Sequence, residues 1–109
     1  MHDAGVKFPN KIALCVEKAS KTNQDLPHLA NPKFLMPQDF TMGEVMNVVR
    51  GKLADVSGEA YDAKNKGLIL LAQGKYVPPQ NNKLKDVYEA YKDVDGFLYL
   101  QYTEENIFG

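Results

Sequence analysis

The sequence predicts an α+β domain in which a four-stranded mixed sheet packs on one central helix. Three observations favour this class: a period of two in residues 11–17, a complete helix-start signal at residues 40–45, and an unbroken apolar run at residues 68–72. Strand and helix patterns therefore share one chain of 109 residues, which is the length of a single domain.

The first two strands are predicted to form a hairpin. Residues 11–17 alternate large apolar side chains with small ones, as a strand does when one of its faces lies in a core. Residues 33–37 supply a second short strand that ends at a proline. Because the segment between them is polar and proline-containing, we expect a wide hairpin.

Residues 40–45 carry the signal that predicts the start of the long helix. Thr41 can cap the first turn, Glu44 completes a capping box, and Phe40 with Val45 occupies the positions of a hydrophobic staple. An apolar stripe at helical spacing follows, formed by Met42, Met46, Val49 and Leu53. Val45 and Val48 extend the apolar surface onto a neighbouring face. The stripe marks the face that packs on the sheet.

The second half of the chain adds two strands and a short helix. Residues 54–66 are rich in polar residues and predict a long loop. The run at 68–72 suits a central strand buried on both faces; its period alone does not exclude a helix, but the flanking glycines favour a strand. A short helical pattern at 84–91 precedes an alternating strand at 97–102, and residues 103–109 show no period.

This order of elements fits a ubiquitin-like β-grasp. A ferredoxin-like fold begins with a strand followed by a helix, so the opening hairpin argues against it. The predicted organisation is a short arm at 1–7, the ubiquitin-like domain at 8–102 and a flexible tail at 103–109.

Composition excludes several classes of protein. Thirteen basic residues against fourteen acidic ones leave no positive excess for nucleic acid, and no apolar run approaches the ~20 residues of a membrane span. The single cysteine cannot form an internal disulfide and suits the cytosol.

Catalysis and metal binding are also disfavoured. The only cysteine nucleophile, Cys15, lies mid-strand among aliphatic residues, and neither His2 nor His28 is held in place to act as its base. Two histidines and one cysteine show no ligand spacing, so we expect no metal and no cofactor. Asp93 and Asp95 are interpreted as turn residues.

Several segments carry a resemblance to one family. They are residues 8–12, 17–19, 33–37, 88–89, the Tyr-Lys-Asp-Val-Asp-Gly-Phe-Leu-Tyr run at 91–99, and the ending Glu-Asn-Ile-Phe-Gly at 105–109. Together they closely resemble the autophagy-related ubiquitin-like modifiers, the family that includes microtubule-associated protein light chain 3 and the gamma-aminobutyric-acid-receptor-associated protein.

The resemblance implies a conjugation site at the end of the chain. Gly109 matches the glycine whose carboxylate is joined to phosphatidylethanolamine, and Phe108 belongs to the tail that is threaded through the enzymes. The implied partners are activating and conjugating enzymes, a processing cysteine protease and, after conjugation, the membrane. The implied location is the cytoplasm, and the autophagosome membrane after lipidation, with this chain acting as a substrate and not as an enzyme.

The resemblance also implies a docking surface for aromatic-x-x-aliphatic peptides of receptors and adaptors. Such a peptide would add a strand to the edge of residues 33–37. The implied aromatic pocket consists of Ala13, Lys33, Leu35 and Phe97. The implied aliphatic pocket consists of Phe34, Met36, Pro37, Phe40, Val45 and Val48.

Two departures from the family modify these expectations. The N-terminal helical extension of the family is largely missing before Phe8, so we expect a more open aromatic pocket. The loop at 54–66 is longer than in the family, and no role is assigned to it. An unconjugated ubiquitin-like peptide-binding adaptor is the alternative function.

Overall fold

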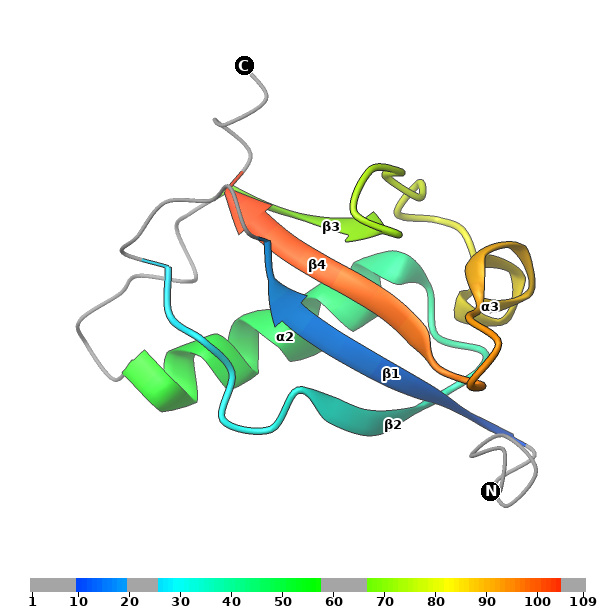
Figure 1. Cartoon of the computed structure of the whole chain (residues 1–109). Helices are drawn as coiled ribbons and strands as arrows, with labels where there is room; N and C mark the ends of the chain where they lie inside the picture. Colours follow the sequence, from blue (N-terminus) through cyan, green and yellow to red (C-terminus); the bar gives the residue numbers. More distant parts are fainter. Residues whose placement is uncertain (1–9, 20–25, 58–66, 105–109) are drawn as a thin grey trace.

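The structure is a computed structural model that describes residues 10–19, 26–57 and 67–104 (Figure 1). Its elements, in chain order, are β1 (Lys11–Lys18), β2 (Lys33–Pro37), α2 (Met42–Ser57), β3 (Leu68–Ala72), α3 (Leu84–Tyr91) and β4 (Leu98–Glu104). This is the predicted order of strands and helices. The predicted arm at 1–7 lies outside the described residues.

The four strands form one mixed sheet in the order β2-β1-β4-β3. β1 is antiparallel to β2 and parallel to β4, and β3 is antiparallel to β4. The first and last strands of the chain therefore lie side by side at the centre, as in a ubiquitin-like β-grasp.

The structure corrects the interpretation of residues 68–72. β3 pairs only with β4 among the described strands and lies at an edge of the sheet, not at its centre. Leu68, Leu70 and Leu71 are buried while Ile69 is half-buried. The absence of alternation therefore reflects packing on both faces of an edge strand.

The long helix covers one face of the sheet. Figure 1 shows α2 crossing behind the strands, and its stripe residues Val49 and Leu53 are fully buried. The capping box is confirmed: the Thr41 N–H donates to Glu44 Oε1 at 2.9 Å, and the Glu44 N–H donates to Thr41 Oγ1 at 3.2 Å. The start of the helix is thus fixed by local sequence.

Two predicted boundaries are wrong. The helix continues through residues 54–57, where the polar composition predicts the start of a loop, because Ala54 has the highest helix propensity and directly follows the buried Leu53. The last strand continues through Thr103 and Glu104, which were expected in the tail, since they pair with Ile69 and Leu68 of β3. Pairing with β3 therefore extends β4 through two residues at which the sequence no longer shows the alternation typical of a strand.

Candidate functional site

No strand in the described part of the chain pairs with the outer edge of β2, and this edge presents backbone hydrogen-bonding groups. The Val16 N–H donates to the Pro32 carbonyl at 2.8 Å, and the Gln38 N–H donates to the Asn10 carbonyl at 3.1 Å, just beyond the two ends of the β1–β2 register. In an antiparallel pair, hydrogen-bonded residues alternate. Phe34 and Met36 therefore direct their backbone groups toward β1, whereas the N–H and carbonyl groups of Lys33 and Leu35 point outward.

The structure brings the four predicted aromatic-pocket residues together on the face of the sheet opposite α2. Ala13 pairs with Leu35 of β2, and Phe97 immediately precedes the Leu14–Leu98 pair of β1 and β4. The Lys33 ammonium lies 5.3 Å from the centre of the Phe97 ring. Leu35 is 36% exposed and Ala13 only 2%, so Ala13 can form only the base of the predicted aromatic pocket, below the longer Leu35 side chain.

The predicted aliphatic-pocket residues gather on the α2 side of β2, except Pro37, which follows the core-facing Met36 and lies on the same face of the sheet as Leu35. Phe34, Phe40 and Val48 are partly buried and pack against the core, and Pro37 is also partly buried. Met36 and Val45 are almost fully buried and can only form the floor.

Val45 and Val48 differ in exposure, although both lie beside the main apolar stripe of α2. Val45 is 0% exposed, whereas Val48, three positions later, is half-buried. Val48 is the valine that a ligand can contact without movement of the helix.

Lys52 is a neighbour of the pocket that the site prediction did not include. Its ammonium lies 4.6 Å from the centre of the Phe34 ring, a distance at which a cation is attracted to an aromatic face. The sequence carried a signal for this contact, since residues 48 and 52 are four apart and share one helix face. Each predicted pocket thus has one lysine over one phenylalanine.

Asp95 fixes the start of β4 beside Phe97 of the predicted aromatic pocket. Its Oδ1 accepts from the Phe97 N–H at 2.9 Å, and its Oδ2 accepts from the Tyr99 hydroxyl at 2.5 Å. The interpretation of Asp95 as a turn residue is confirmed. The Tyr99 hydroxyl and the Phe97 amide, as hydrogen-bond donors, hold the pKa of Asp95 below its usual range, and the bond to Asp95 raises the pKa of Tyr99 to about 12.

We expect this hydrogen bond to make stability fall in strong alkali. The raised pKa of Tyr99 means that its contribution is complete below the ordinary tyrosine pKa of 10 and is lost as pH rises through about 12. The free energy of unfolding should therefore drop more steeply over this interval in the wild type than in Tyr99→Phe, measured by urea unfolding. Parallel curves for the two proteins would contradict this role, and titration of other tyrosines and lysines cancels in the comparison.

Cys15 lies in the sheet as a packing residue. It is 4% exposed, and burial raises the pKa of its thiol. His28 is exposed in the segment before β2, and His2 lies outside the described residues. Among residues 10–19, 26–57 and 67–104, no group of three His, Cys, Asp or Glu side chains could hold a metal ion.

The mixed sheet, with the first and last strands side by side at its centre, and the helix behind it define a ubiquitin-like protein. The family model described as "Autophagy protein Atg8 ubiquitin like" matches residues 2–109. The chain therefore belongs to the Atg8 family of ubiquitin-like autophagy proteins.

Individual relatives agree with this assignment. Autophagy-related protein 8e of Arabidopsis thaliana is 35% identical over 94% of this chain and 76% of its own length. Human microtubule-associated protein 1 light chain 3 gamma is 34% identical over 94% of this chain and 65% of its own. The crystal structure of Trypanosoma brucei ATG8 superposes with a TM-score of 0.77 and 30% identity, over 93% of this chain and 78% of that one.

Proposed function

We propose that this protein is a modifier that is conjugated through the carboxylate of Gly109 to phosphatidylethanolamine, and that then recruits receptors carrying aromatic-x-x-aliphatic peptides. The observation that carries the proposal is the family match, which extends to residue 109 and thus includes the terminal phenylalanine and glycine. Gly109 and Phe108 themselves lie outside the described residues.

In the conjugation reaction, this chain supplies only a carboxylate. ATP converts the carboxylate of Gly109 to an acyl-adenylate with release of pyrophosphate, and an enzyme thiol displaces AMP to form a thioester. The lipid amine then displaces the thiol to form an amide. A glycine suits transfer through the narrow channels of these enzymes because it has no side chain to clash with the channel walls. The chain is therefore a substrate of activating and conjugating enzymes, and a cysteine protease would expose Gly109 in any longer precursor.

The edge of β2 supports the peptide-binding part of the proposal. Successive side chains of a strand point to opposite faces, so two residues three positions apart lie on opposite sides of a sheet. A peptide strand hydrogen-bonded to Lys33 and Leu35 would place its aromatic residue beside Phe97 and its aliphatic residue beside Phe40 and Val48. This matches the spacing of the aromatic-x-x-aliphatic motif.

Membrane attachment would come from the conjugated lipid. No helix in the described part of the chain is long and apolar enough to cross a membrane. The two acyl chains of a phospholipid suffice for stable anchoring. We propose that the protein is cytoplasmic before conjugation and associated with the autophagosome membrane after it.

Conjugation is tested by intact mass. The protein is incubated with activating and conjugating enzymes from the same organism, ATP, magnesium and phosphatidylethanolamine vesicles, beside a variant lacking Gly109. We expect a mass increase of one lipid minus one water in the full chain and no increase in the deletion variant. If enzymes that are active on another modifier leave the full chain unchanged, conjugation is wrong and the unconjugated peptide-binding adaptor takes its place.

A further inference from the structure

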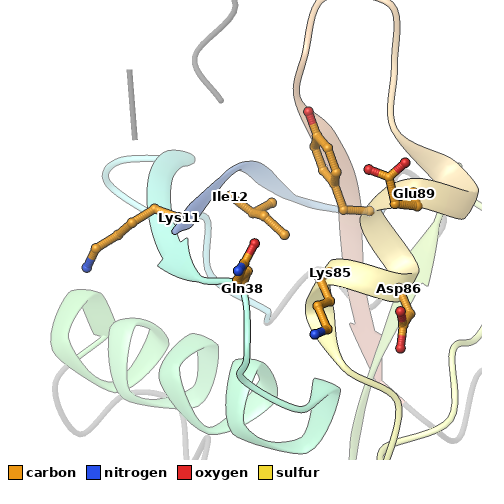
Figure 2. Close-up of a pocket in the computed structure, with 7 residues that line it drawn as sticks. Lys11, Ile12, Gln38, Lys85, Asp86 and Glu89 are labelled. Atoms are coloured by element: carbon orange, nitrogen blue, oxygen red, sulfur yellow. The ribbon is translucent and has the colours of Figure 1, made fainter. Parts of the chain in front are cut away.

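A cavity of about 360 Å³ lies on the α2 side of the sheet, between the start of β1 and α3 (Figure 2). Ile12 and Gln38 point toward its middle, and Tyr88 lines it from α3. The Tyr88 hydroxyl donates to the Gly96 carbonyl at 2.9 Å, so the ring is held in place, and the Lys92 ammonium lies 5.5 Å from the ring centre. The volume is at the lower end of the range for ligand sites, enough for one or two side chains.

The wall that separates this cavity from the aliphatic pocket is rigid. The Lys85 N–H donates to the Gln38 carbonyl at 3.0 Å, and the Leu84 N–H donates to the Phe40 carbonyl at 2.7 Å. Gln38 lines the cavity, and Phe40 is one of the predicted pocket residues. The same short segment, residues 37–40, therefore borders both hollows.

Two acidic and two basic side chains line the cavity. Asp86 and Glu89 lie one turn apart on α3, and both line the cavity. Of the two lysines that line it, Lys85 lies 3.7 Å from Asp39, and Lys11 extends away from the other lining side chains (Figure 2).

Asp86 is the more available of the two carboxylates. Glu89 is paired with Lys92 at 3.3 Å, an exposed contact that contributes little energy. No cation among the described residues forms an ion pair with Asp86. A long basic side chain could place its stem on Ile12 and Tyr88 and its charged end at Asp86.

The direction of a docked peptide leads toward this cavity. The aromatic pocket uses Lys33 and Leu35 of β2, while the aliphatic pocket uses residues further along, at 36–40, so the peptide would run in the same direction as β2. Pro37 has no N–H and ends the strand. Residues after the aliphatic anchor are thus released beside Gln38, which itself lines the cavity.

We propose that this cavity binds the segment that follows the aliphatic anchor of a docked peptide, and that it selects an arginine or lysine there. The inference rests on the proposed peptide binding at β2 and adds a determinant of specificity to it. The basic side chain packs its aliphatic stem against Ile12 and Tyr88 and is held by the Asp86 and Glu89 carboxylates.

The test compares three peptides that are identical through the aliphatic anchor and carry arginine, alanine or glutamate at the second and third positions after it. Dissociation constants are measured by isothermal titration calorimetry on the full chain. We expect the arginine peptide to bind about fivefold more tightly than the alanine peptide, and the glutamate peptide more weakly than either. The double variant Asp86→Asn, Glu89→Gln should bring the arginine and alanine peptides to within about twofold.

The matched control is Glu17→Gln, which removes one exposed carboxylate toward the far end of β1 and should leave the arginine preference intact. Equal affinity for all three peptides would overturn the proposal for the cavity while leaving the β2 groove in place. A preference that survives in the double variant would also overturn it. Failure of every peptide to bind would overturn the groove itself.

Discussion

A Leu35→Pro variant should lose most of its affinity for an aromatic-x-x-aliphatic peptide and still fold. The N–H of Leu35 points to the free edge of β2, so its removal deletes a donor that β1 does not use. A peptide carbonyl that is left without this donor costs about 1–3 kcal/mol, which corresponds to roughly five- to 150-fold in dissociation constant. The measurement is titration calorimetry, with urea unfolding to show that the domain is intact.

The fold should tolerate this proline for a reason visible in the sheet. Proline is accepted in edge strands where the missing N–H would face solvent, and Pro37 already occupies an equivalent outward-facing position two residues later. Leu35→Ala is the matched variant, because it shortens the same side chain and keeps the N–H. Equal affinity of the proline and alanine variants would show that the peptide does not pair with this edge.

Leu100→Ala should give the largest loss of stability that we expect from a single substitution. Leu100 is fully buried and pairs with Val16 of β1 and with Ala72 of β3, so it occupies a central strand and its side chain packs in the core. Removing a buried leucine side chain costs about 2–5 kcal/mol, against a total of about 5–15 kcal/mol for a domain of ordinary stability. Urea unfolding followed by circular dichroism measures the change.

Val94→Ala provides the control for this substitution. Val94 is completely exposed in the turn before β4, at 103%, so shortening its side chain leaves no cavity. Its midpoint of unfolding should stay within error of the wild type. A comparable loss in both variants would mean that the turn, and not the packing under the sheet, limits stability.

Features that depend only on neighbouring residues could be predicted from the sequence. The capping box of Thr41 and Glu44 joins residues three apart, and the alternation in β1 needs only one buried face. Both could therefore be predicted from neighbouring residues. Lys52 could have been added to the site by the same reasoning, because it follows Val48 by one helical turn.

Features that depend on distant partners could not be predicted in this way. The extension of β4 through Thr103 and Glu104 needs pairing with β3, more than thirty residues earlier in the chain. The burial of Val45 depends on how closely α2 approaches the sheet, and the cavity joins residues 11 and 12 to residues 85–89. No periodicity in the sequence records these contacts.

Patterns among neighbouring residues predict the order of strands and helices and the start of the long helix, and the resemblance to a family predicts the residues of the groove. The edge positions of β2 and β3, the outward direction of the Lys33 and Leu35 backbone groups, and the difference in exposure between Val45 and Val48 follow from the folded chain alone. Periodicity reports which side chains are buried, whereas edges and cavities depend on which strands pair, and strand pairing joins residues far apart in the chain.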